Sequence, residues 1–379
     1  MMLALLVTLV LLLLLLPLLP ALQEWRWPTD VEPLRIDDDD ALDPMHMAHR
    51  FGERLNQALQ AGQILLGKTN IVRFRPTAAM WPLLGEEIAK RSSRRLWYLD
   101  GSAELPAGFD FLSEVAASDH LSTAPGRVYR ALMAGGRLRL APDCRVLRWL
   151  HGDEVAIGVD CLLGGRVTAE RSMHIDVGTR FSFLHAPTIV FGRPGDAASS
   201  RSQPSGVFVI YAGLKHEMAQ PFVRSRAADE APLTIDSNHA WRGDLVRRGD
   251  VVMGCDCRTL GSIKTHGSLV LGPGCHVSGS LFARGEIVLG PGCVVLGCIA
   301  SETAIRLESG CQVGSPEQAS TVTAPRLDIA PAVRVHGTVW AEDCGCAVRL
   351  AKTAQIRGQS GIDIQPNVSV AEDAMRGAA

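Results

Sequence analysis

GSLVLGPGCHVSGSLFAR (residues 267–284) is followed without a gap by GEIVLGPGCVVLGCIASE (residues 285–302), and the two stretches are nearly the same. The period is 18 residues, and it extends beyond these two stretches. A fixed period of this kind is typical of repeat proteins, in which each repeat packs against its neighbours. Two columns follow the period: the cysteine column is Cys257, Cys275, Cys293 and Cys311, and the glycine column is Gly243, Gly261, Gly279 and Gly297.

A finer pattern lies within each repeat, where apolar or small residues form pairs two positions apart that recur every six residues. Leu269 with Leu271 and Cys275 with Val277 are two such pairs. A period of two predicts a strand whose alternate side chains face one side. Three short strands per repeat, separated by polar corners or by glycine, which adopts backbone angles closed to other residues, predict one coil of a triangular β-solenoid. Successive coils would then stack ~4.8 Å apart, at the usual strand spacing.

A weaker form of the same repeat precedes the strong one. LPAGF, APGR, LAPDC and GVDC resemble the LGPGC phrase and place Phe109, Arg127, Cys144 and Cys161 on one column. A run rich in Gly, Ser, Pro and Ala then separates the two sets of repeats, which is loop chemistry. The predicted fold is therefore predominantly all-β, with a first solenoid block at 96–192, an insertion loop at 193–232, a second block at 233–370 and a polar tail at 371–379.

The N-terminus is apolar and uncharged from residue 1 to residue 22. A membrane-spanning helix needs about 20 apolar residues, so 1–22 is predicted to be a transmembrane anchor, followed by interfacial Trp25 and Trp27. A cleaved signal peptide is the alternative, but neither a basic start nor a clear cleavage site is present. Arg26 and Arg35 after the span favour a cytoplasmic body.

Residues 23–95 are predicted to be a linker followed by a small α/β region that covers the first coil. Asp43 and Pro44 resemble an N-cap and a first helical position, and apolar residues then recur every four, which predicts a helix over about 44–61. The basic cluster Lys90, Arg91, Arg94 and Arg95 indicates either a solvated surface or contact with lipid headgroups. The net charge of −2 gives no general attraction to nucleic acid.

Candidate chemistry is sparse. The cysteine column could hold a metal or form disulfides between coils, but a row of parallel side chains suits neither geometry, so small core residues are the favoured interpretation. No phosphate loop, zinc-protease motif or nucleophile elbow occurs in the sequence. No catalytic, cofactor-binding or metal-ligating residue is therefore assigned. A hexapeptide acyltransferase, a left-handed β-helix with 18 residues per coil, is the enzymatic alternative, and it would use His266 or His276 as its base.

The repeated stretches GDLVRRGDVVMGCDC, GSIKTHGSLVLGPGC and GSLFARGEIVLGPGC resemble the bactofilins, the bacterial polymer-forming cytoskeletal proteins. The likeness is clear over about 233–313 and loose over the rest of the solenoid. The resemblance implies a right-handed triangular β-helix that assembles end to end without nucleotide at the cytoplasmic face of the bacterial inner membrane. The two blocks, the insertion and the folded N-terminal region depart from the compact single solenoid of that family.

The sequence therefore predicts a single-pass, membrane-anchored scaffold of bactofilin type that needs no cofactor. An exposed terminal coil is a template for another chain, and the C-terminal coils near 360–370 are expected to make the self-association contact. The expected partners are a second copy, the membrane through the N-terminal helix, and envelope-assembly proteins. The acyltransferase and an envelope binding module stay open as alternatives.

Overall fold

The structure is a computed structural model that describes residues 2, 6, 9–10, 14–26, 43–76, 81, 83, 85–192 and 230–349. The chain divides into two compact units, residues 1–56 and 57–379. The first unit contains η1 (Leu16–Leu18), α2 (Leu19–Arg26) and most of α4 (His46–Gln60). The described part of the chain has no helix that is both long and apolar enough to cross a membrane. The anchor expected at 1–22 lies partly outside the described residues.

Helix α4 begins where the sequence predicts a helix start. The Asp43 carboxylate accepts a hydrogen bond from the Met45 backbone N–H at 2.8 Å, which satisfies one of the unpaired donors of the first turn. His49 Nδ1 lies 2.9 Å from the other Asp43 oxygen. The helix therefore spans His46–Gln60, close to the expected 44–61.

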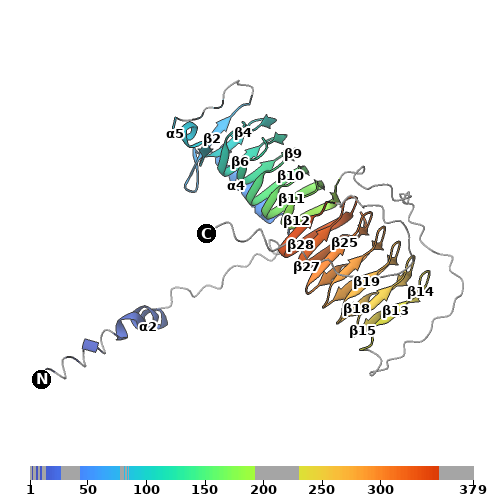
Figure 1. Cartoon of the computed structure of the whole chain (residues 1–379). Helices are drawn as coiled ribbons and strands as arrows, with labels where there is room; N and C mark the ends of the chain where they lie inside the picture. The colour runs from blue at the N-terminus through green and yellow to red at the C-terminus, as the bar shows by residue number, and fades with distance from the viewer. Residues whose placement is uncertain are drawn as a thin grey trace. The chain divides into compact units, whose positions relative to one another are not determined.

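The second unit is a β-solenoid, whose stacked coils are visible in Figure 1. Its first block begins with a β-hairpin and a short helix and continues in parallel strands. The elements are β1 (Leu65–Leu66), β2 (Thr69–Phe74), α5 (Gly85–Lys90), β3 (Ser92–Ser93), β4 (Leu96–Leu99), β5 (Ala103–Glu104), β6 (Asp110–Ala117), β7 (Leu121–Ser122), β8 (Val128–Ala134), β9 (Arg137–Leu140), β10 (Arg145–Ile157), β11 (Leu162–Ile175) and β12 (Arg180–Phe191).

The second block has shorter strands, because a turn or bend interrupts the chain at nearly every corner. Its elements are β13 (Leu233–Ile235), β14 (Ala240–Arg242), β15 (Leu245–Arg247), β16 (Val251–Met253), β17 (Arg258–Leu260), β18 (Ile263–Thr265), β19 (Leu269–Leu271), β20 (His276–Val277), β21 (Leu281–Ala283), β22 (Ile287–Leu289), β23 (Val294–Val295), β24 (Ile299–Ser301), β25 (Ala304–Leu307), β26 (Gln312–Val313), β27 (Ser320–Ile329) and β28 (Arg334–Ala347).

Three ladders of hydrogen-bonded strands form the three sides of the solenoid, and each ladder runs through both blocks. Ladder 1 passes through β13, β16, β19, β22 and β25, ladder 2 through β15, β18, β21 and β24, and ladder 3 through β14, β17, β20, β23 and β26. Within either block, strands of neighbouring coils pair in parallel. In the regular coils each residue pairs with the residue 18 positions further along the chain. The long strands β10, β11, β12, β27 and β28 bend at the corners and contribute to more than one ladder.

The two blocks meet end to end at β12 and β28, which pair antiparallel. The C-terminal coil of each block therefore faces the other. On the way to this junction the first block visits the ladders in the order 1, 2, 3 and the second in the order 1, 3, 2. Because both the sense of rotation and the direction of advance are reversed, both blocks wind with the same hand.

The hydrophobic core is a narrow column of inward-facing side chains that continues from the first block into the second. Leu271, Leu289 and Leu307 stack on ladder 1, and Val277, Val295 and Val313 stack on ladder 3, all at most 1% exposed. Parallel pairing begins at β2, N-terminal to the boundary expected at 96. Residues 193–229, 350–370 and the tail 371–379 lie outside the described residues.

Candidate self-association site: the ends of the solenoid

One corner of the solenoid, between ladders 1 and 3, has the same backbone conformation in both blocks. The residue before each column position has a positive φ, for example +72° at Gly274 and +57° at Asp143. Glycine, asparagine and aspartate tolerate this left-handed conformation best, which explains the PGC and PDC phrases. The residues at this corner are Gly108, Gly126, Asp143, Asp160, Gly178, Asn238, Asp256, Gly274, Gly292, Gly310 and Ala332.

The cysteine column lies directly after this corner, inside the solenoid, and each of its thiols donates a hydrogen bond to a carbonyl of the preceding coil. Cys275 Sγ lies 3.0 Å from Gly254 O, and Cys293 Sγ lies 3.1 Å from Gly272 O. Cys161 in the first block makes the same contact with Ala141 O at 3.2 Å. Thr179, one coil further on, replaces the thiol with a hydroxyl that donates to Gly158 O at 2.9 Å. The column therefore satisfies a corner carbonyl in each coil.

The buried thiols are poor candidates for chemistry. Burial raises the pKa of Cys161 to about 12 and also raises the pKa of Cys144. A thiol that stays protonated is neither a nucleophile nor a good metal ligand. All ten cysteines are free thiols in the described structure, and the geometry accounts for the column positions as hydrogen-bonded core residues.

The glycine column has two physical bases. Gly243 and Gly261 have a positive φ, +94° and +154°, as expected for corner glycines, whereas Gly279 and Gly297 have ordinary backbone angles. A Cβ added to Gly279 would lie 2.4 Å from the backbone of Gly261, and one added to Gly297 would lie 2.5 Å from Gly279 O. These two glycines are required because the backbones of neighbouring coils approach closely there.

The junction between the blocks is nearly two-fold symmetric. The first segment of β12 pairs with the last segment of β28, as in Arg180 with Cys346, and the middle segments pair with each other, as in Leu184 with Val339. At the edges, Gly178 N–H donates to Ala347 O at 2.6 Å. The two ends therefore match each other about a pseudo-two-fold axis, although they are different surfaces.

Side chains repeat this symmetry. His185 Nδ1 on β12 lies 2.9 Å from Thr338 Oγ1 on β28, and His336 Nδ1 on β28 lies 3.2 Å from Thr188 Oγ1 on β12. His336 Nδ1 also lies 3.1 Å from Pro187 O, and its side chain is buried, which lowers its pKa. Each histidine of the junction thus finds a polar partner on the opposite block.

Gly345 accommodates an aromatic ring across the junction. A Cβ at this position would lie 2.2 Å from the ring of Phe181, which is its register partner on β12. Phe181 is 3% exposed and packs on Phe191 with ring centroids 5.9 Å apart. The junction is therefore closely packed. The last described coil is covered, because β12 occupies the edge of β28. The coils near 360–370, which were expected to make the self-association contact, lie outside the described residues.

The N-terminal end of the first block is closed by aromatic side chains and by the β1–β2 hairpin. Trp81 lies against Phe74 and Trp97, with ring centroids 5.0 and 5.3 Å away, and Trp97 lies against Phe111. This large aromatic surface fills the end of the core. The α/β region expected before residue 96 therefore forms the first coils and the closure of the first block.

A buried ion pair stabilises this closed end. Arg95 Nε donates to Glu87 Oε1 at 2.9 Å, and the Ser93 hydroxyl donates to the same oxygen at 2.6 Å. Lys90 pairs with Glu86 at 3.0 Å. Two members of the basic cluster expected to contact solvent or lipid are thus paired with carboxylates of α5.

The N-terminal end of the second block is the open one. Within the described residues, each strand of its first coil has one pairing partner: β13 pairs with β16, β14 with β17, and β15 with β18. The opposite edge of each strand has no strand beside it in the described part of the chain. Val246 on this coil is 50% exposed.

Two buried polar atoms in the interior of this open end lack a partner among the described residues. The indole Nε1 of Trp241 and the hydroxyl of Thr259 are both buried and make no hydrogen bond there. The two residues are register neighbours on ladder 3, and Thr259 is 2% exposed. Buried polar groups without hydrogen-bond partners are rare and costly. Two of them lie at the open end, and Arg127 Nε and Arg130 Nε in the first block are others among the described residues.

The histidines considered for an acyltransferase are exposed residues at separate positions. His266 follows β18 on ladder 2, whereas His276 lies on β20 in ladder 3. Within the part of the chain that the structure describes, no carboxylate is hydrogen-bonded to either side chain. Among the described residues, neither histidine is therefore placed beside a carboxylate that could orient it as a general base.

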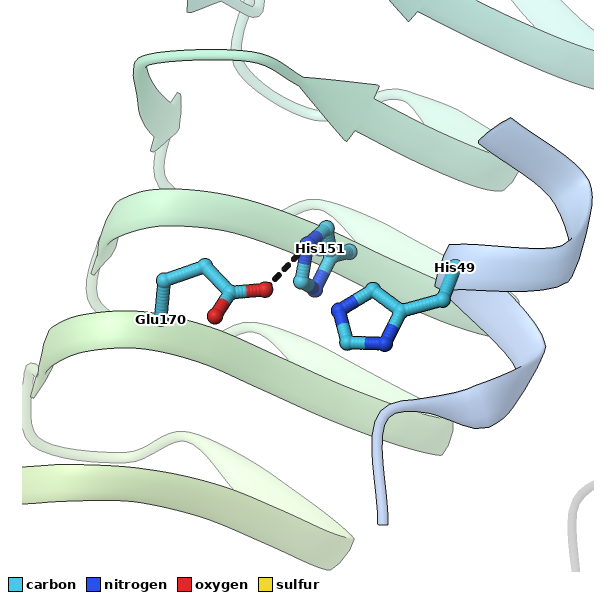
Figure 2. Close-up of side chains that lie close together, drawn as sticks. All are labelled: His49, His151 and Glu170. Atoms are coloured by element: carbon cyan, nitrogen blue, oxygen red, sulfur yellow. Dashed lines mark ion pairs between the residues drawn. The ribbon is translucent and has the colours of Figure 1, made fainter. Parts of the chain in front are cut away.

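A different histidine, which the sequence analysis did not single out, forms a buried polar contact in the first block. His151 on β10 is 5% exposed, and its Nδ1 lies 2.8 Å from the Thr168 hydroxyl on β11. Its Nε2 lies 3.4 Å from a Glu170 carboxylate oxygen, as Figure 2 shows. A row of register partners on the outer face of ladder 2 continues from this contact to the junction. Its members are His151, Thr168, His185 and Thr338. His151, Thr168 and His185 lie 17 residues apart, which is also the spacing of Arg127, Cys144 and Cys161, so a periodic signal for this row is present in the sequence.

Comparison with family models, with curated proteins and with solved structures finds no match to this chain.

Proposed function

We propose that this protein is a structural scaffold of bactofilin type: a membrane-anchored, right-handed β-solenoid that self-associates through an end of the solenoid without nucleotide. The observation that carries the proposal is the open coil formed by β13, β14 and β15. The opposite end of the same block is covered by β12, and the far end of the first block is closed by aromatic residues. Among the described strands, the coil of β13, β14 and β15 leaves an edge unpaired on all three sides, whereas at the far end of the first block β2 has partners on both sides and β3 and β5 have one partner each.

A second copy of the chain is the occupant that the molecule favours for this edge. The β12–β28 junction is an example, within the chain, of two solenoid ends stacking antiparallel. The open coil also offers donors and acceptors on all three sides, and a free strand edge is a template for pairing. The buried Trp241 Nε1 and Thr259 hydroxyl would find partners when such an end is covered.

The test uses a proline at the free edge. Leu245 N–H donates to Ser262 O on the neighbouring coil. Successive N–H groups alternate in direction along a strand, so the Val246 N–H points to the open edge. Val246→Pro removes this donor without removing a bond inside the solenoid. Val246→Ala is the matched control, because it keeps the donor and shortens the same side chain.

The measurement is analytical ultracentrifugation of the full chain in detergent micelles from about 0.1 to 100 μM. The wild-type chain and Val246→Ala are expected to increase in mass with concentration, whereas Val246→Pro stays monomeric with an unchanged circular dichroism spectrum. A monomeric wild-type chain over the whole range would contradict self-association. In that case the edge is occupied within one chain.

The anchor and the bacterial inner-membrane location are part of the same proposal. They rest on the uncharged stretch of residues 1–22, followed by the tryptophans at 25 and 27. Removing residues 1–22 is expected to release the protein from bacterial membranes during carbonate extraction, whereas the full chain stays in the pellet. A C-terminal reporter that is active only outside the cytoplasm would reverse the orientation and favour an envelope binding module.

A further inference from the structure

We infer that the β12–β28 junction is an exchangeable interface, at which the last coil of the first block of one copy pairs with the last coil of the second block of another copy. The inference extends the proposed self-association to a second edge of the solenoid. It does not use the open coil, so each contact can be tested without the other. The partner in both cases is a second copy of this chain.

The first observation is that the strand pairing between the blocks is confined to one coil. In the described residues, β12 and β28 make all the ladder pairs that join the first block to the second. Each block also has its own stack of coils and its own stretch of core. Opening the junction therefore separates the blocks without breaking a coil inside either of them.

The second observation is the path of the chain. The first block ends at Gly192, beside the junction, where Gly192 N–H donates to Ile175 O. The described chain begins again at residue 230, at the open coil, which is the far end of the second block. The connection thus starts at the junction and ends at the far end of the second block, so the two paired strands are not joined by a short loop.

The distance that the connection must cover follows from the ladder. Ladder 1 passes from β12 through β28, β27, β25, β22, β19 and β16 to β13. Those seven steps correspond to ~34 Å at ~4.8 Å per strand. Residues 193–229 number 37 by position, and a chain of that length reaches at most ~130 Å. The same connection can therefore join blocks within one copy or between two copies.

The third observation is the matching of the two faces. His185 with Thr338 and His336 with Thr188 are reciprocal pairs across the junction, and the Phe181 ring lies over Gly345. The same surfaces meet whether the second block belongs to the same copy or to another. Exchange of identical elements preserves every native contact, and this is what makes swapped dimers accessible.

The effective concentration of the linked second block decides whether the junction forms within one chain or between two chains. A linked partner is present at millimolar effective concentration, so the closed single copy dominates in dilute solution. Exchange becomes favoured when the connection is too short to reach across the second block. Four residues between Gly192 and residue 230 make five Cα–Cα steps that reach at most ~18 Å, which is less than the ~34 Å required.

The first experiment shortens the connection in the full chain. Deletion of residues 195–227 leaves four residues between Gly192 and residue 230 and is combined with Val246→Pro to remove association at the open coil. The control carries Val246→Pro and a 37-residue Gly-Ser replacement of residues 193–229. Light scattering is expected to give twice the single-chain mass for the deletion and the single-chain mass for the control. A monomeric deletion variant with intact β-structure would overturn the inference.

The second experiment detects exchange without a deletion and covers the case in which the shortened chain does not fold. Phe183 and Trp340 are register partners across the junction. One chain carries Phe183→Cys and another carries Trp340→Cys, both with Val246→Pro and with serine at positions 255, 298, 344 and 346. After mixing at 100 μM and mild oxidation, a disulfide between the two chains is expected. The control is one chain that carries both Phe183→Cys and Trp340→Cys, which should form the disulfide within the chain. If this control forms its disulfide and the two mixed chains form none between them, exchange is overturned and the proposed function is unaffected.

Discussion

The two ends of the second block are built from the same kind of coil but meet different surroundings. At the C-terminal end, β12 pairs with β28, and His336 and His185 find hydroxyl partners on the opposite block. At the N-terminal end, β13, β14 and β15 each have one neighbour among the described strands, and the Trp241 indole N–H has no partner there. The end of the second block at β28 is thus completed by the end of the first block, whereas the coil of β13, β14 and β15 has no such neighbour among the described strands. The open coil is therefore the place to look for a second copy.

The largest expected effect compares a core residue inside the block with one at the open end. Leu289 on β22 has coils on both sides, whereas Ile235 on β13 has a coil on one side. Leu289→Ala is expected to cost about 2–5 kcal/mol because it leaves a cavity in a closed column. Ile235→Ala is expected to cost less, because its cavity opens to solvent.

Hydrogen exchange of the neighbouring strands measures both costs. The Ile235→Ala cost should increase with protein concentration, since a second copy that covers the open coil closes the cavity. Equal costs for the two variants at low micromolar concentration would show that the first coil is already covered within one chain.

The next effect tests the packing of the junction. Gly345→Ala places a methyl group against the Phe181 ring and is expected to destabilise the junction by about 1–3 kcal/mol through overpacking. Gly164→Ala on β11 is the matched control, because its nearest new contacts are at 3.4 and 3.5 Å, which is ordinary packing. Faster amide exchange in β12 and β28 for the first variant only is the expected result. Equal exchange in both variants would show that Phe181 does not lie over Gly345.

A smaller effect separates the two roles of the thiol column. Cys161→Ala removes the donor to Ala141 O and is expected to cost about 1 kcal/mol beyond the lost volume. Cys161→Thr should recover most of this loss, because Thr179 makes the equivalent hydrogen bond one coil further on. Thermal unfolding of the two variants gives the comparison. A threonine variant less stable than the alanine variant would contradict the hydrogen-bonding role.

The smallest effect is a pH dependence of the junction. Burial lowers the pKa of His336, with Arg334 acting in the same direction and Pro187 O and Glu317 opposing it; the Thr188 hydroxyl also faces the ring. A lowered pKa means that the stability from the neutral ring is intact above about pH 6.5 and falls as the pH drops below it. The loss is at most about 1.4 kcal/mol for each pH unit within that window.

Amide exchange of β12 and β28 at pH 7.5 and 5.5, corrected for intrinsic rates, measures this dependence. His336→Asn should flatten it, because an amide does not titrate in that range. A wild-type junction whose stability is the same at both pH values would contradict the role given to His336.

The sequence predicts the coil well because the coil is local. The LGPGC phrase contains the left-handed corner, the inward thiol and the two-residue strand period within a few positions, so the 18-residue repeat indicates the solenoid directly. Corner glycines were expected at Gly243, Gly261, Gly279 and Gly297, and the first two of these have a positive φ. The second left-handed column, which the P-G-C and P-D-C phrases already contain, was missed.

The way the blocks are joined could not be predicted from the repeat. The pairing of Leu184 with Val339 links positions 155 apart, and it depends on the fit of two coil ends and not on any period. From the repeat alone, the coils near 360–370 are expected to make the self-association contact, and these residues lie outside the described part of the chain. The closing ion pair of Glu87 with Arg95 was missed for a similar reason, because both residues look like ordinary surface charges until the first coils fold.

The end-to-end arrangement is tested most directly by a distance between the blocks. Leu162 on β11 and Val252 on β16 are exposed residues on ladder 1. Spin labels are attached at Leu162→Cys and Val252→Cys, in a chain with serine at positions 255, 298, 344 and 346. Seven ladder steps separate the two positions, so pulsed electron resonance should give ~34 Å. If the coil at 233 instead followed directly on β12, three steps would separate them, and a distance of ~14 Å would contradict the account.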